Sequence, residues 1–204
     1  MLFRSVVTVT DTKVLPTAIV ANPTNITCLA ASQILDGTGS SAGANFTYTW
    51  QLANGANISL NPSSLNPTIV SGGTYTLIVT NTTNSCTATK SVVVTQNTTK
   101  PNANAGTPKT ITCSSTSVAL LGTGSNGGQY QIQWVGPGGN VPSASGGNTY
   151  TPTVTQTGNY TLKVTDISNG CEESSNTSVS LDLNVPVANA GTAKQLDCAV
   201  TRII

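Results

Sequence analysis

Alternation of apolar and polar residues divides this chain into short stretches that are typical of β-strands. Residues 73–80 read Gly-Thr-Tyr-Thr-Leu-Ile-Val-Thr, which places Tyr75, Leu77 and Val79 on one face. Residues 46–50, Phe-Thr-Tyr-Thr-Trp, alternate in the same way. Turn residues separate these stretches and no helical period appears between them. The pattern predicts an all-β chain of antiparallel sandwiches, with about seven strands each and no helix.

The alternating pattern recurs with a period of 85 residues. Residues 73–80 return as 158–165, and residues 46–50 return one position early as 130–134. A fixed period of this size indicates a tandem array of similar domains. The inward positions agree between the copies, and the predicted core consists of Trp50, Trp134, Tyr75, Tyr160, Leu77 and Leu162.

The period also sets the expected limits of the repeats. Residues 1–10 match the closing strand of a preceding repeat when they are shifted by 85 positions. We expect a first repeat at 11–95, a second at 96–181 and the start of a truncated third at 182–204. A proline stands near each start, which suits a boundary because proline donates no ladder hydrogen bond.

Five cysteines follow the same period. Cys28 and Cys86 are 58 residues apart, and so are Cys113 and Cys171. We expect a disulfide within each of these pairs, and we expect Cys198 to be half of a pair that this sequence does not complete. Closing a loop of this length stabilises a small domain by about 4 kcal/mol on the chain-entropy model.

Several motifs resemble known repeat families. A tryptophan on the third strand and the Gly-x-Tyr that enters the sixth resemble an immunoglobulin-like (Ig-like) sandwich with its tyrosine corner. The segments Leu-Asp-Gly-Thr-Gly-Ser at 35–40 and Tyr-Thr-Trp at 48–50 are similar to polycystic-kidney-disease-type repeats. The ending Tyr-Thr-Leu-x-Val-Thr…Cys resembles the Ig-like repeats of very large surface adhesins in gliding Bacteroidota. The usual immunoglobulin cysteine is replaced by Leu77 or Leu162, so the usual inter-sheet bridge is not expected.

The composition of the chain limits the kinds of partner that it is expected to bind. Charged residues make up 7% of the chain and the net charge is +1, so neither nucleic acid nor membrane insertion is expected. The expected partners are neighbouring repeats of the same chain or identical chains in a filament. Paired cysteines in register are typical of an oxidising compartment, so we expect an extracellular or cell-surface location, reached through a signal that this segment does not contain.

No group of residues in the sequence suggests a catalytic or metal-binding site. The chain has no histidine, and its carboxylates form no general acid and base pair at a credible spacing, so no enzyme activity and no cofactor are expected. Zinc is not expected without histidine or a close Cys-x-x-Cys spacing. Asp36 and Asp166 lie near turns, where the capping of a turn explains them better than calcium does.

Three functions remain open on the sequence. The first is a structural segment of a long extracellular fibre or adhesin stalk. The second is a binding module that contacts a glycan or a protein through segments 51–64 and 135–148. The third is a spacer in a secreted enzyme. Residues 1–10 suggest a variant of the structural function, in which this strand completes the sheet of an identical subunit by strand addition and so builds a filament.

Overall fold

The computed structural model describes residues 13–54, 58, 62–140, 149–184 and 188–193. Its regular structure is β-strand throughout these residues, as the sequence pattern predicts, and no helix among them is long and apolar enough to cross a bilayer. The predicted strand at residues 1–10 and Cys198 lie outside the described residues.

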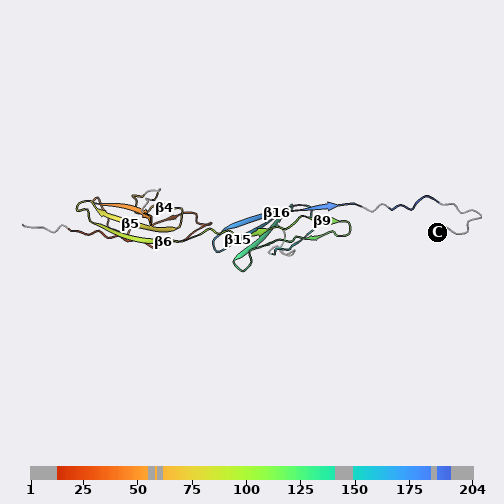
Figure 1. Ribbon diagram of the computed structural model, residues 1–204, viewed down its shortest axis with the longest axis horizontal. Helices are drawn as coiled ribbons and strands as arrows, with labels where there is room; N and C mark the ends of the chain where they lie inside the picture. The colour runs from red at the N-terminus through yellow and green to blue at the C-terminus, as the bar shows by residue number, and fades with distance from the viewer. Residues whose placement is uncertain (1–12, 55–57, 59–61, 141–148, 185–187, 194–204) are drawn as a thin grey trace, which may run out of the picture. The chain divides into compact units, whose positions relative to one another are not determined.

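The strands follow the alternating stretches of the sequence (Figure 1). In the first half of the chain they are β1 (Ile26–Thr27), β2 (Gln33–Ile34), β3 (Phe46–Leu52), β4 (Thr68–Ile69), β5 (Gly73–Asn81), β6 (Thr87–Val94) and β7 (Gln96–Asn97). In the second half they are β8 (Ala103–Asn104), β9 (Lys109–Thr112), β10 (Val118–Ala119), β11 (Thr123–Gly124), β12 (Tyr130–Gly136), β13 (Gly139–Asn140), β14 (Thr153–Val154), β15 (Gly158–Asp166) and β16 (Glu172–Asp182).

The first half forms two layers. Strands β3, β5 and β6 make an antiparallel sheet in that order, and β2 pairs with β4 in the opposite layer. The short β1 pairs in parallel with β7, which continues the line of β6. Parallel pairing of the first strand with the last, together with antiparallel hairpins elsewhere, is the arrangement of an Ig-like sandwich.

The second half repeats this plan with longer pairing. Its main sheet has the order β13-β12-β15-β16-β9, and β10 pairs with β14 in the opposite layer. Strand β9 runs parallel to β16, as β1 does to β7. Strand β16 is unbroken for 11 residues, whereas the first half divides the equivalent stretch into β6 and β7. The fold is therefore all-β and Ig-like in both halves.

Contacts group the chain into two compact units. Unit 1 contains Met1–Ala103, Gly124–Ile132 and Lys163–Ser174. Unit 2 contains the remaining three segments, Asn104–Thr123, Gln133–Leu162 and Ser175–Ile204. The repeat limits at 95 and 181 describe the period of the sequence rather than these contacts, and they stay a prediction.

The six predicted core side chains are buried, none with more than 3% of its surface exposed. Trp50 and Trp134 are fully buried, and each indole Nε1 donates to a backbone carbonyl, Ser64 O at 3.0 Å and Thr149 O at 3.1 Å. A buried indole N–H needs such an acceptor, because a lost hydrogen bond in a dry interior costs about 1–3 kcal/mol. The segment after each tryptophan strand is therefore fixed to the core.

A tyrosine corner closes each sandwich. The Tyr75 hydroxyl donates to Ser71 O and the Tyr160 hydroxyl donates to Gln156 O, both at 2.7 Å and both four residues upstream. This is the geometry of the tyrosine corner in Ig-like domains. Burial raises the pKa of the Tyr160 phenol, so the hydroxyl stays a hydrogen-bond donor at neutral pH.

We expect Tyr75→Phe and Tyr160→Phe each to lower the free energy of unfolding by about 1 kcal/mol, because each leaves one carbonyl without its donor. Urea denaturation followed by tryptophan fluorescence measures the change. The matched control is Val93→Thr, at a position of the neighbouring strand β6 that is 64% exposed, with an expected effect within about 0.5 kcal/mol. Equal losses in the control and the tyrosine variants would contradict the role of the corner.

Candidate functional site

A disulfide joins cysteines that the sequence spacing did not pair. Cys28 is bonded to Cys171, with Cα atoms 5.0 Å apart and 143 residues of separation. Cys86 is half-buried and Cys113 is exposed, and both are free thiols. The expected bridges Cys28 to Cys86 and Cys113 to Cys171 are therefore corrected by the structure.

The length of the closing strand explains the correction in the first half of the chain. Thr27 lies opposite Asn97, so Cys28 sits near the end of β7. Cys86 precedes Thr87, the first residue of β6. Between positions 86 and 97 the chain advances about 35 Å at a strand rise of about 3.3 Å per residue. A disulfide needs Cα atoms within about 7 Å, so these two cysteines cannot meet.

The second half has the same geometry. Thr112 lies opposite Asp182, which places Cys113 beside the end of β16. Cys171 directly precedes the start of that strand, and the strand is 11 residues long. The two cysteines thus lie near opposite ends of a strand about 36 Å long. A bridge within the repeat is excluded here for the same reason.

The bonded Cys171 belongs to a tightly hydrogen-bonded turn in unit 1, residues 166–171, called turn 2 below. Asn169 is 1% exposed, and its side chain organises the turn. Its Oδ1 accepts from Cys171 N at 2.9 Å, while its Nδ2 donates to Thr99 O at 3.0 Å and to Asn97 Oδ1 at 3.1 Å. The alternating pattern does not single out this residue, although an asparagine stands two positions before both Cys86 and Cys171.

The cysteine-bearing loop lies directly against turn 2. This loop, residues 27–30 (loop 1), is closed by a hydrogen bond from Thr27 N to Ala30 O at 3.0 Å, and Leu29 N donates to Asn169 O at 3.3 Å. The Leu29 side chain covers Gly170, where an added Cβ would come within 2.0 Å of Leu29 Cγ. Gly170 also has φ of +71°, which favours glycine. A side chain at position 170 would therefore strain the backbone and push aside Leu29, which is 79% exposed.

One ion pair borders this contact. Lys100 Nζ lies 3.2 Å from Glu173 Oε2, and this hydrogen bond holds the pKa of Glu173 below its usual range. The Lys100 and Glu173 side chains are 64% and 39% exposed, so water screens the pair and its contribution to stability is small. The disulfide and the buried asparagine carry the contact.

The first half of the chain contains the same turn. Residues 81–86, called turn 1, are fixed by Cys86 N donating to Asn84 Oδ1 at 3.0 Å and Asn81 N donating to Cys86 O at 2.8 Å. Both bonds have counterparts in turn 2 at 2.9 Å, formed by residues 85 positions later. Ser85 has φ of +59° where turn 2 has Gly170, so the backbone of the two turns agrees.

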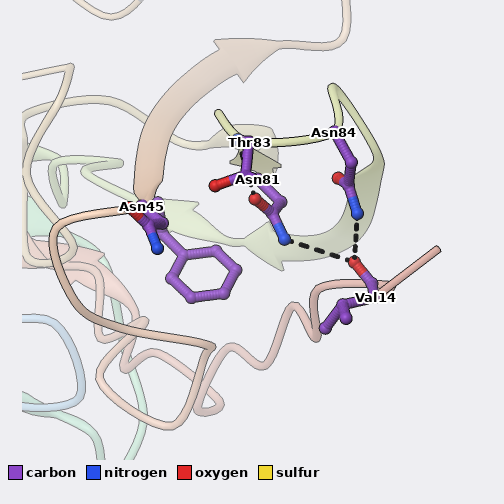
Figure 2. Close-up of a pocket in the computed structure, with 6 residues that line it drawn as sticks. Val14, Asn45, Asn81, Thr83 and Asn84 are labelled. Atoms are coloured by element: carbon purple, nitrogen blue, oxygen red, sulfur yellow. Dashed lines mark hydrogen bonds between the residues drawn. The ribbon is translucent and has the colours of Figure 1, made fainter. Parts of the chain in front are cut away.

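A shallow hollow of about 400 Å³ borders turn 1. It is lined by Val14, Asn45, Phe46, Asn81, Thr83 and Asn84. Figure 2 shows the Val14 carbonyl held by two amides, with Asn84 Nδ2 at 3.1 Å and Asn81 Nδ2 at 3.3 Å. Val14 stands 85 positions before Thr99, whose carbonyl is held by Asn169 in turn 2. The chain entering each sandwich is therefore tied to its turn by the same bond.

The two aspartates considered for calcium cap turns. Asp36 Oδ1 accepts from Thr38 N at 3.0 Å and from Thr38 Oγ1 at 2.6 Å, and these bonds lower the pKa of Asp36. Asp166 Oδ1 accepts in the same way from Ser168 N at 2.9 Å and Ser168 Oγ at 2.6 Å. Within the described residues no group of three or more His, Cys, Asp or Glu side chains is placed to hold a metal ion.

No protein-family model matches the chain, and neither does any curated protein sequence. Among solved structures, a three-domain I-band fragment of titin is 14% identical with a TM-score of 0.45, over 82% of this chain and 66% of that one. Three N-terminal domains of the outer capsid protein of bacteriophage RB49 are 16% identical with a TM-score of 0.39, over 81% of this chain and 59% of that one. Sidekick-1 immunoglobulin domains 1–4 are 15% identical with a TM-score of 0.36, over 81% of this chain and 52% of that one.

This chain spans less than two thirds of each of those three structures. At these TM-scores the likeness carries no argument about function. The Ig-like assignment depends instead on the strand pairing, the buried tryptophans and the two tyrosine corners described above.

The disulfide assignment predicts a specific peptide map. Trypsin without reductant should release the peptide 14–90 joined to 164–194, because cleavage falls after Lys13, Lys90, Lys163 and Lys194. Peptide 14–90 also contains Cys86, and alkylation of Cys86 in the joined product assigns the bond to Cys28. The peptide 110–163, which contains Cys113, should be found alkylated. Mass spectrometry of the digest identifies both products. A peptide 110–163 joined to 164–194 would instead show the pairing within the repeat.

Asn169→Ala should lower the free energy of unfolding by about 1–3 kcal/mol, because it leaves Cys171 N and Thr99 O without their buried partner. Urea denaturation under non-reducing conditions measures the change. Asn184→Ala, at an exposed position, is the control and should stay within about 0.5 kcal/mol. An unchanged stability of the Asn169 variant would mean that the turn does not depend on this amide.

Proposed function

We propose that the chain is a load-bearing segment of an extracellular fibre or adhesin stalk. The observation that supports this function is the covalent path through the Cys28–Cys171 bond. Tension that enters from the N-terminal side passes from Cys28 directly to Cys171 and leaves along β16. Residues 29–170 lie outside this path, so pulling on the chain does not extend them.

The residues outside the path include both tryptophan cores. Trp50, Trp134 and both tyrosine corners lie between Cys28 and Cys171 in the sequence. Non-covalent packing in these sandwiches is therefore not what resists the load. A covalent bond resists it, and the cores keep their shape at forces that would otherwise unfold them. A spacer in a stalk needs this property because its length must not change under tension.

Surface composition fits the same role. Only 7% of the residues are charged, and Thr, Ser and Asn supply the polar positions of the strands, as in the outward run Thr74, Thr76, Ile78 and Thr80 of β5. Such a surface is hydrated without attracting ions or nucleic acid. An extracellular location is part of the proposal, because a disulfide that carries load must persist, and it persists in an oxidising compartment.

Recognition of a glycan or a protein is the alternative. Its predicted contact segments, 51–64 and 135–148, lie partly outside the described residues. In the described part of the first segment, Pro62 O and Ser64 O accept hydrogen bonds from the backbone and the indole of Trp50. This part is thus bonded to the core, which favours the structural role. A spacer role in a secreted enzyme would use the same mechanical properties.

Single-molecule force spectroscopy tests the load path. The full chain is tethered by its two ends and stretched with and without reductant. Reduction should add about 490 Å of contour length, because 143 residues at about 3.4 Å each are released. Cys28→Ser should show the longer contour without reductant. Cys86→Ser, which removes a free thiol, should behave like the unchanged protein.

Two outcomes would contradict the proposal. If reduction left the contour unchanged, no covalent bypass would exist. If Cys28→Ser released only part of the length that reductant releases, the load would run through separate bridges within the repeats. Both outcomes are read from the same extension curves.

A further inference from the structure

Cys86 and Cys113, the two free thiols in the part of the chain that the structure describes, lie one period away from the bonded pair. Cys113 stands 85 residues after Cys28, and Cys86 stands 85 residues before Cys171. Cys113 of one molecule and Cys86 of another are thus the counterparts of the two bonded cysteines. We propose that two copies of this chain dock head to tail and join through a Cys113–Cys86 disulfide that repeats the Cys28–Cys171 bond.

The receiving side of this contact is already built in turn 1. Turn 1 and turn 2 share their two internal hydrogen bonds, their left-handed residue and the tie to the entering chain. The backbone atom that receives Leu29 N in turn 2 is Asn169 O, and its counterpart in turn 1 is Asn84 O. Turn 1 therefore has a backbone carbonyl and a cysteine at the positions equivalent to those that turn 2 uses.

The delivering side is built in residues 112–115, called loop 2. Thr112 N donates to Ser115 O at 3.0 Å, the same length as the bond that closes loop 1. Ser115 N also donates to Thr112 Oγ1 at 3.1 Å, and its loop 1 counterpart measures 3.2 Å. Loop 2 therefore holds Cys113 in the backbone shape that brings Cys28 to its partner, with the thiol exposed.

Side-chain size matches the proposed contact. In the bonded pair, Leu29 covers Gly170 and leaves no room for a Cβ. In the proposed pair, Ser114 takes the place of Leu29 and Ser85 takes the place of Gly170. Ser85 carries the Cβ that Leu29 would strike with its Cγ and with both of its Cδ methyl groups. Ser114 has only an Oγ beyond its Cβ, and this Oγ is hydrogen-bonded to Thr112 Oγ1 at 3.1 Å. Loop 2 therefore brings less side-chain volume to turn 1 than loop 1 would.

The hollow beside turn 1 lies next to the proposed contact. It shares Asn84 with the proposed contact and is lined on the other side by Phe46 and Val14. Ser85 is exposed and Cys86 is half-buried, so both can be reached from outside the molecule. A second copy that presents loop 2 would cover this surface.

Bond formation needs an electron acceptor, and we assign this role to a small-molecule disulfide. The thiolate of Cys113 attacks one sulfur of that disulfide, which releases one small thiol and leaves a mixed disulfide on Cys113. The Cys86 thiolate of the second copy then attacks the Cys113 sulfur and releases the second small thiol. Two protein thiols are oxidised, one small disulfide is reduced to two thiols, and their protons pass to the released thiolates. This chemistry does not depend on the load-bearing role.

Mixing of single-cysteine variants tests the docking. All proteins carry Cys198→Ser, so that only Cys86 and Cys113 remain as candidates beside the bonded pair. In a glutathione redox buffer the otherwise unchanged chain should give a ladder of disulfide-linked oligomers on non-reducing gels. Cys86→Ser and Cys113→Ser should each lose the ladder, and their mixture should give one heterodimer and stop there. Tryptic mapping should give peptide 14–90 joined both to 164–194, through Cys28, and to 110–163, through Cys86.

Homodimers of either variant alone, or a statistical mixture of homodimers and heterodimers, would show random oxidation and overturn the proposal. So would the absence of any ladder while the Cys28–Cys171 bond remains intact in the peptide map. That intact bond is the control for folding in every sample.

Exchange of the size pair provides a second test. Ser114→Leu in the delivering chain should slow heterodimer formation with a Ser85 chain, because Leu would strike the Ser85 Cβ. Ser85→Gly in the receiving chain should restore the rate, since it recreates the Leu29–Gly170 contact. Equal rates in all combinations would mean that the cysteines meet without the proposed docking.

Discussion

The distance between the two ends of the closing strand determines which cysteines of this molecule can form a disulfide. In each half of the chain, one cysteine precedes that strand and the other lies beside its end, about 35 Å away. A disulfide spans only about 7 Å between Cα atoms. The cysteines of one repeat therefore cannot bond to each other. Each can bond only where the end of one closing strand meets the start of another, and Cys28 and Cys171 do so in unit 1.

The separation of roles between core and disulfide follows from this distance. An ordinary Ig domain places its bridge across the core, and here Leu77 and Leu162 fill those positions with apolar side chains. Burial of these residues with Trp50, Trp134 and the two corner tyrosines gives each sandwich its own apolar interior. The cysteines are then available for contacts at the ends of the sandwiches. The core determines the shape of each sandwich, and the disulfide supplies the covalent connection between Cys28 and Cys171.

The sequence predicted the strands, the core and the corners because each depends on local alternation. Tyr75, Leu77 and Val79 are buried because they alternate with Thr and Ile, and no distant residue is needed to see it. The cysteine partner depends on which repeat supplies it. Cys86 and Cys171 differ by one whole period, so the periodicity that located them could not choose between them. Counting residues along the closing strand would have excluded Cys86, since the strand is too long. The role of Asn169 was missed because its partners, Asn97 and Thr99, are about 70 residues away in the sequence.

The backbone has the same shape at turn 1 and turn 2, but the side chains of the two turns differ. Hydrogen bonds around Asn84 and Asn169 give both turns the same shape, so the two turns are equivalent in their backbone. The next residue breaks the equivalence, because Ser85 and Gly170 leave different amounts of room above a left-handed backbone. Leu29 lies directly over Gly170, where a Cβ would come within 2.0 Å of the Leu29 Cγ. Repeats with one fold can therefore prefer particular neighbours through a single position, which is how an array of similar domains can keep its order.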